Sequence, residues 1–412
     1  MLLLGWTKTL QPTWLYPAST TPWTLTLSSA QKLTQQQSGM RSLMYPPSES
    51  WPILIFFNGL GGHRLITAMT EGIARAHNIQ ILTIDKPSAG SSKCTDNFAL
   101  PLFARTRWMH TALLAVLAHL QITRFAVLSH SNGLFYALYT LLHLPPSLKA
   151  TSWTLSGPFV PHTISGSRAL RLAAALPTPL PNALGTLMQA MPPVARVMWR
   201  KRETRKGKPP HERGYMHRYV NTACREAIMR RAIDESRVAM GQEALFCLHG
   251  EDSASSTTAG ANASSPSTSP LGGTALANGC VWGLGPGATP AAILQGAFTR
   301  LAELQSQRAQ GGLRIHVVYG ADDGMVPVQG RVWLRGVLEA AGLLSDEGEG
   351  DADDGEHGEV GETVDYNAPW EEVPGAGHDD VLFLEAVIKP IMRRVRVRAG
   401  SAPASGSVVS EG

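Results

Sequence analysis

Short apolar runs alternate with helix-type patterns through the middle of the chain. Residues 52–57 read P-I-L-I-F-F and precede Asn58-Gly59, as expected for a buried parallel strand that ends in a turn. Four further runs of this kind predict strands at 79–84, 125–128, 152–155 and 313–319. Helical spacing of apolar residues predicts helices between them, at 68–76, 106–120 and 133–142. Strands that alternate with helices predict an α/β fold with a parallel sheet and right-handed crossovers.

The alternation stops between residues 155 and 313. Residues 165–245 have a helical tendency interrupted by prolines, and the stretch 252–278 is rich in Ser, Thr, Ala and Gly and too poor in large apolar residues to order itself. The predicted organisation is an N-terminal extension 1–43, a core of 44–164 and 281–398, a helical cap 165–250, a disordered low-complexity insert 251–280, a disordered acidic insert 345–363 within the core, and a disordered tail 399–412.

Charge is unevenly distributed along the 412 residues. The formal net charge is +4, but residues 346–365 contain ten acidic and no basic residues, which leaves 36 basic against 22 acidic side chains elsewhere, a balance of +14. The basic residues are mostly dispersed and form no aromatic-interleaved stripe, so a nucleic-acid partner is not expected. Two local basic segments, 196–208 and 393–398, are interpreted as solvated faces, with peripheral contact to acidic lipid as the alternative.

Four cysteines, widely spaced and without a C-x-x-C pair, indicate neither a metal site nor a disulfide framework. Such scarcity favours a reducing compartment. The apolar start at residues 1–6 is too short for a signal-peptide core, and no run of about 18 apolar residues predicts a transmembrane segment. We expect a cytoplasmic protein that needs no cofactor and no metal.

The segment 125–134, F-A-V-L-S-H-S-N-G-L, reads as strand, tight turn and helix with Ser131 at the apex. A turn that exposes a serine in this way is strained and brings strand and helix backbones together, so its flanking residues must be small. Ser129 and Gly133 meet that need. The backbone N–H of Asn132, at the helix N-terminus, is a candidate donor to a developing oxyanion. The alternative is an ordinary strand-to-helix turn that Ser131 caps.

A second oxyanion donor is expected from the glycine-rich loop Asn58-Gly59-Leu60-Gly61-Gly62, through the backbone N–H of Leu60. A phosphate-binding loop is the competing interpretation. Neither G-x-G-x-x-G nor G-x-x-x-x-G-K-[ST] matches this segment, which disfavours nucleotide binding.

Candidates for the catalytic acid and base follow the serine in the sequence. Asp323, after the predicted strand 313–319, is the preferred acid, with Asp322 beside it as an alternative and Asp252 as a more distant one. His378, in P-G-A-G-H-D-D before a C-terminal helical pattern, is the candidate base. Its neutral imidazole would take the proton of Ser131 while Asp323 orients the ring.

Taken in this order, the motifs resemble the α/β-hydrolase superfamily, in its capped branch and close to fungal hydrolase-type members, over about residues 45–165 and 280–395. The resemblance implies a mostly parallel eight-stranded sheet, a helical cap inserted between two late strands, and the chain order Ser131, Asp323, His378. Three positions depart from the family pattern: Asn58 stands where histidine is frequent, and Ser129 and Ser88 stand where glycine is usual.

The sequence therefore predicts a serine hydrolase that cleaves a carboxylic ester or related acyl substrate through an acyl-enzyme on Ser131. The Leu-, Ala- and Met-rich segment 170–198 favours a small-molecule substrate with an apolar, ester or lipid-like acyl group, although ordinary helix packing explains the segment equally well. A non-catalytic binding protein with the same fold is the main alternative. Hydrolysis of a C–C bond and acyl transfer are related chemistries that stay open.

Overall fold

The computed structural model of the chain describes residues 51–89, 102–177, 179–182, 222–249, 289–307, 312–344 and 369–400. The predicted N-terminal extension 1–43, low-complexity insert 251–280 and acidic insert 345–363 lie outside these residues. Of the predicted tail 399–412 only the first two residues are described, and they close the last helix.

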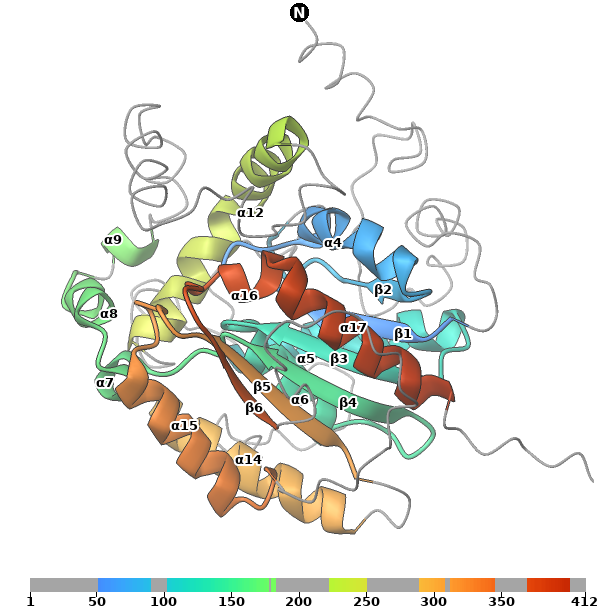
Figure 1. Ribbon diagram of the computed structural model, residues 1–412. Helices are drawn as coiled ribbons and strands as arrows, with labels where there is room; N and C mark the ends of the chain where they lie inside the picture. The colour runs from blue at the N-terminus through green and yellow to red at the C-terminus, as the bar shows by residue number, and fades with distance from the viewer. Residues whose placement is uncertain are drawn as a thin grey trace, which may run out of the picture.

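The core is one sheet of six parallel strands in the order β2-β1-β3-β4-β5-β6 (Figure 1). The predicted α/β class is confirmed, and the described residues contribute six strands where eight were expected. In chain order the strands are β1 (Ile53–Phe57), β2 (Gln80–Leu82), β3 (Arg124–His130), β4 (Lys149–Ser156), β5 (Arg314–Gly320) and β6 (Trp370–Val373).

Helices cover both faces of the sheet because successive side chains of a buried parallel strand point to opposite sides. Leu54 and Phe56 pack with α4 and α17, whereas Ile55 and Phe57 pack with α5, α6, α14 and α15. In Figure 1 α17 crosses in front of the strands. The helices that follow β1 to β3 and those that follow β5 and β6 are α4 (Arg64–Ala76), α5 (Leu102–His119), α6 (Gly133–Leu142), α15 (Val328–Ala340), α16 (Asp380–Phe383) and α17 (Glu385–Gly400).

The segment between β4 and β5 is helical where it is described. Its helices are α7 (His162–Ser165), α8 (Arg168–Ala174), α9 (Pro179–Asn182), α12 (Thr222–His249) and α14 (Pro290–Ser306). α14 packs on the sheet, while α12 packs against α8, α9 and α4 and passes the ends of the strands (Figure 1). Among the described residues, no helix combines the length and apolar character needed to cross a membrane.

The strand order defines where a ligand site should lie. The chain moves from β1 outward to β2, then returns to the other side of β1 and continues through β3, β4, β5 and β6. In open parallel sheets the crevice beyond the carboxyl ends of the strands at such a reversal is the usual ligand site. Here it lies between β1 and β3, where Phe57 pairs with Ser129. The loops that follow these two strands contain Gly59 and Ser131.

Candidate active site

Ser131 occupies a strained turn between β3, which ends at His130, and α6, which begins at Gly133. Its φ is 50°, in the left-handed region that non-glycine residues rarely adopt. The turn is tight because α6 starts directly against β1. A Cβ at Gly133 would lie 2.2 Å from the carbonyl oxygen of Phe57, so only glycine fits there. The turn predicted from the sequence is therefore present, with the serine at its apex.

Ser129, the first departure from the family pattern, is accommodated inside the sheet. Its hydroxyl accepts a hydrogen bond of 2.9 Å from Nε1 of Trp153 on the neighbouring strand β4. Trp153 is fully buried, and its indole N–H needs an acceptor there. The extra hydroxyl thus satisfies a buried donor.

The other two departures, Asn58 and Ser88, lie in the loops that follow β1 and β2. Asn58 donates 3.1 Å to the hydroxyl of Thr83 and so ties the end of β1 to the end of β2. Ser88, where the family usually has glycine, has a φ of 65°. The backbone there keeps the left-handed conformation that glycine would adopt most easily.

The glycine-rich loop lies against the serine. A Cβ on Gly59 would be 3.1 Å from Cβ of Ser131 and 3.0 Å from the ring of His130, so the backbone of this loop approaches the turn closely. The candidate oxyanion donors Leu60 and Asn132 flank this contact. Within the described part of the chain, neither of their backbone N–H groups has an acceptor.

Asp323 and His378 form a hydrogen-bonded pair. Oδ2 of Asp323 lies 2.7 Å from Nδ1 of His378, and Oδ1 accepts from the backbone N–H groups of Met325 and Val326 at 2.8 and 2.9 Å. Asp323 is 3 % exposed, whereas Asp322 is an exposed residue whose backbone N–H bonds to Ala376. The structure thus pairs the preferred acid with the histidine. The alternative Asp252 lies outside the described residues.

The loop that carries His378 is fixed against the acid strand. A Cβ on Gly320 would lie 2.2 Å from the carbonyl oxygen of Ala376, so β5 and the histidine loop touch directly. Asp380 accepts 2.8 Å from the N–H of Gly377 and holds the loop at the start of α16. Burial would lower the pKa of His378, but the hydrogen bond and negative charge of Asp323 outweigh it, and the pKa is raised above its ordinary value.

The serine and the histidine are not hydrogen-bonded to each other. Nε2 of His378 is buried and has no partner among the described residues. The ring beside it belongs to His130, whose centroid is 5.2 Å from that of His378. Hydrogen bonds between catalytic groups are often long or misaligned before a substrate binds. Asp323 and His378 are therefore in contact, as predicted. Ser131 lies at the same edge of the sheet but makes no hydrogen bond to His378.

One group of side chains in the described ranges has a geometry suited to a metal ion. One ring nitrogen each of His130 and His378 and a carboxylate oxygen of Asp379 lie within 4.8 Å of one another. Nδ1 of each ring already faces an acceptor, Ser156 O for His130 and Asp323 for His378. A cation there would have to use Nε2 of His378, the atom that the sequence-based hypothesis assigns as the base for Ser131. The expectation of a site that needs no metal stays a prediction.

A buried polar network next to the serine was not predicted. Lys86, in the loop after β2, donates from Nζ to Gly59 O, Asn132 Oδ1 and Glu243 Oε2 at 2.7, 3.2 and 2.8 Å. Glu243 comes from α12 and also accepts from Asn132 Nδ2 at 3.1 Å and from the hydroxyl of Tyr136 at 2.8 Å. No local pattern pointed to this pairing, because Lys86 and Glu243 are 157 residues apart.

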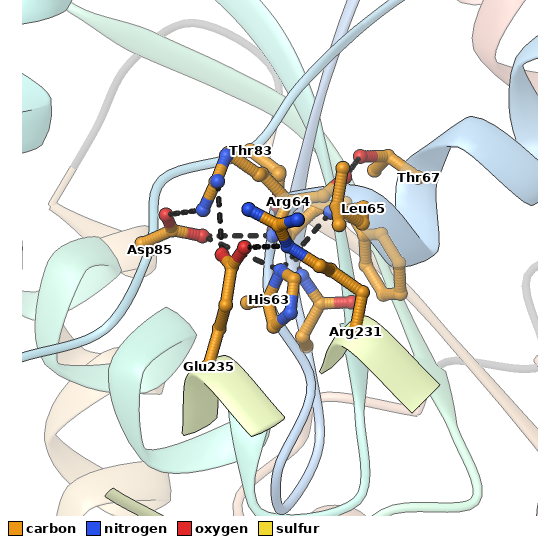
Figure 2. Close-up of polar contacts among 10 residues, drawn as sticks. His63, Arg64, Leu65, Thr67, Thr83, Asp85, Arg231 and Glu235 are labelled. Atoms are coloured by element: carbon orange, nitrogen blue, oxygen red, sulfur yellow. Dashed lines mark hydrogen bonds and ion pairs between the residues drawn. The ribbon is translucent and has the colours of Figure 1, made fainter. Parts of the chain in front are cut away.

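A second polar cluster joins α12 to the same loops two turns earlier along the helix (Figure 2). Arg64, at the start of α4, bonds Asp85 through its backbone N–H at 2.8 Å and through its guanidinium, and it reaches Glu235 at 3.0 Å. Figure 2 shows Glu235 and Arg231 extending from α12 toward Arg64. Two glutamates of α12 thus attach this helix to the adjacent residues Asp85 and Lys86. Glu235 reaches Asp85 through Arg64, and Glu243 contacts Lys86 directly.

No family model and no curated protein matches the sequence. Solved structures that the chain resembles include a carboxylesterase of the thaumarchaeon Nitrososphaera gargenis, at 11% identity and a TM-score of 0.46 over 87% of this chain and 94% of that one. MenH from S. aureus has 11% identity and a TM-score of 0.46, covering 87% and 98%. A bacterial membrane phospholipase A has 10% identity and a TM-score of 0.46, covering 97% of both chains.

All three TM-scores are below 0.5, so the class of this protein rests on its own topology. The sheet of this protein is parallel and has helices on both faces. Its serine stands on a left-handed turn between a strand and a helix, and the acid and the histidine follow later strands in that order. This is the α/β-hydrolase arrangement that the motifs led us to expect.

Proposed function

We propose that the protein is a serine hydrolase that cleaves a carboxylic ester or related acyl substrate through an acyl-enzyme on Ser131. The observation that carries the proposal is the arrangement at one sheet edge: a serine in a left-handed turn and a histidine already oriented by a buried carboxylate. A strained, over-determined backbone of this kind is typical of functional positions.

Each residue has a role that follows from its contacts. Asp323 holds the proton of His378 on Nδ1, which leaves Nε2 as the base for the hydroxyl of Ser131. Attack on the ester carbonyl gives a tetrahedral oxyanion, which would accept from the N–H groups of Leu60 and Asn132. His378 then protonates the leaving alcohol. Water, deprotonated by the same imidazole, releases the acid from Ser131.

An apolar acyl group agrees with the side chains near the turn. Leu60 is 36 % exposed beside Gly61, and a Cβ on Gly61 would lie 2.2 Å from Cε of Met240 on α12. The backbone N–H of Phe159 bonds to the carbonyl of Ser131 at 3.3 Å and places another apolar residue beside it. In this proposal α12 and the helices before it act as the cap.

Labelling with a fluorophosphonate tests the proposal directly, because the reagent needs an activated serine and not a particular ester. The wild-type chain should be labelled at Ser131, and Ser131→Ala should abolish both labelling and turnover of a p-nitrophenyl ester. Ser129→Ala is the matched control, since that hydroxyl faces Trp153, and it should keep the label. A folded wild-type chain that is neither labelled nor active would overturn the proposal.

A non-catalytic ligand-binding protein is the second candidate, favoured by the missing hydrogen bond between Ser131 and Nε2 of His378. It predicts that apolar carboxylates or esters bind without turnover and that Ser131→Ala binds them equally well. Calorimetric titration alongside the labelling experiment separates the two candidates.

A further inference from the structure

We propose that Lys86 is a positioning residue that orients both oxyanion donors and couples them to α12. The inference rests on the proposed function. It starts from the fact that Lys86 contacts the two residues that set those donors, Gly59 and Asn132.

The first donor is fixed through its peptide group. The carbonyl of Gly59 and the N–H of Leu60 belong to one peptide unit, and no cis peptide occurs in the described chain. In a trans peptide the C=O and N–H point in opposite directions. Lys86 Nζ holds the Gly59 oxygen at 2.7 Å, and the N–H of Gly62 holds it at 3.0 Å. The N–H of Leu60 must therefore point away from Lys86. A cation on the carbonyl oxygen also polarises that peptide and strengthens the N–H as a donor.

The second donor is fixed through its side chain. Asn132 is held at both ends of its amide, with Oδ1 accepting from Lys86 and Nδ2 donating to Glu243. Asn132 follows Ser131 directly, so this clamp also stabilises the strained turn. An ammonium has three protons, and the three acceptors of Lys86 use all of them. All three N–H groups of the Lys86 ammonium therefore donate to these acceptors, and the three hydrogen bonds fix the position of its side chain.

The network is buried and contains three charged side chains. Lys86, Arg105 and Glu243 are each no more than 2 % exposed. Glu243 contacts Lys86 at 2.8 Å and lies 3.8 Å from the guanidinium of Arg105. Burial lowers the pKa of Lys86, and the adjacent Glu243 opposes that change. The ammonium of Lys86, bonded to Gly59 O and Asn132 Oδ1, favours the negative charge that develops on the substrate oxygen. Because Glu243 belongs to α12, the helix that passes over the site also sets its electrostatics.

Lys86→Met tests the proposal by removing the cation and its three hydrogen bonds. Methionine keeps the aliphatic stem, and Glu243 keeps Arg105, Tyr136 and Asn132 as partners. We expect kcat for a p-nitrophenyl ester to fall about tenfold to a hundredfold with KM within about twofold, because an interaction made only in the transition state lowers kcat and kcat/KM together. Arg64→Met is the matched control: it removes a cation bonded to the other glutamate of α12 and should leave kcat within about twofold.

Lys86→Arg tests the positioning role of Lys86 if Lys86→Met does not fold. It keeps the charge, but the longer planar guanidinium cannot place one proton on each of the same three acceptors, so kcat should fall several-fold with KM unchanged. Wild-type kcat in either folded variant overturns the inference and leaves the proposed function intact. An equal loss in Arg64→Met also overturns it, because α12 attachment alone would then explain the effect. A wild-type chain without labelling or turnover overturns the proposed function and this inference together.

Discussion

Exchange of Asp323 for asparagine should lower kcat severely without unfolding the site, for a reason visible in the hydrogen bonds of Asp323. Oδ1 accepts from the N–H groups of Met325 and Val326, so in Asp323→Asn the amide oxygen must take that side. The amide NH₂ then replaces Oδ2 and faces Nδ1 of His378. Since both groups cannot donate, the imidazole has to move its proton to Nε2.

An imidazole protonated on Nε2 cannot accept the proton of Ser131. Where a carboxylate has this role, the exchange lowers kcat by about 10⁴, which corresponds to roughly 5 kcal/mol in the activation free energy. The assay is steady-state hydrolysis of a p-nitrophenyl ester from pH 5 to pH 9, with fluorophosphonate labelling as a check on the serine. Remaining activity should extend to lower pH, because the carboxylate that raises the pKa of His378 is gone.

The exposed neighbour Asp322 supplies the control. Asp322→Asn is an equal chemical change one residue away, and it should leave kcat within about twofold, since its backbone N–H and not its carboxylate bonds to the histidine loop. If Asp323→Asn kept more than a tenth of the wild-type rate, the tautomer argument would be wrong. Equal losses in both variants would reassign the acid.

Three other outcomes follow from the same geometry. For the wild-type chain, a pH–rate profile should show kcat/KM rising with pH to a plateau, with a midpoint above 6.5. The reason is that His378 must be neutral to act as base and its pKa is raised. A midpoint well below 6.5 would contradict this. Gly133→Ala places a methyl group 2.2 Å from Phe57 O and should lower the free energy of unfolding by at least roughly 1–3 kcal/mol, measured by urea denaturation; an unchanged midpoint would refute the close approach. Ser129→Ala leaves the buried Trp153 N–H without an acceptor and should cost about 1–3 kcal/mol by thermal melting, with labelling of Ser131 retained; full stability would show that the N–H finds another partner.

The fold was predictable where the local pattern and the burial agree. The run 52–57 and the helix 133–142 coincide with β1 and α6, because both are buried on every side and read as continuous apolar segments. β6 was missed for the opposite reason: its sequence, W-E-E-V, is half acidic, and it is an edge strand recognisable only once β5 pairs with it. The cap boundaries at 165–250 stay a prediction.

The candidate site was predictable as far as short motifs reach. Ser131, Asp323 and His378 each stand in a turn with its own glycine and strand context, and the structure brings the last two into contact. Lys86 lies in the segment 85–92, D-K-P-S-A-G-S-S, where no local feature indicates that its side chain is buried. Its partner Glu243 lies on α12, whose polar residues read in the sequence as a solvent-exposed helix face. Only the three-dimensional packing of α12 on the sheet edge turns them into a buried network.

The left-handed backbone at Ser131 opposes the proposed activity to the stability of the folded chain. A side chain at φ 50° costs of order 1 kcal/mol or more that glycine would not lose. Ser131→Gly should therefore melt at a higher temperature than the native chain while being chemically inert, and Ser131→Ala should not gain in this way. Selection for a more heat-resistant form would meet its strongest opposition at this residue, since relaxing the backbone here removes the hydroxyl on which the proposed reaction depends.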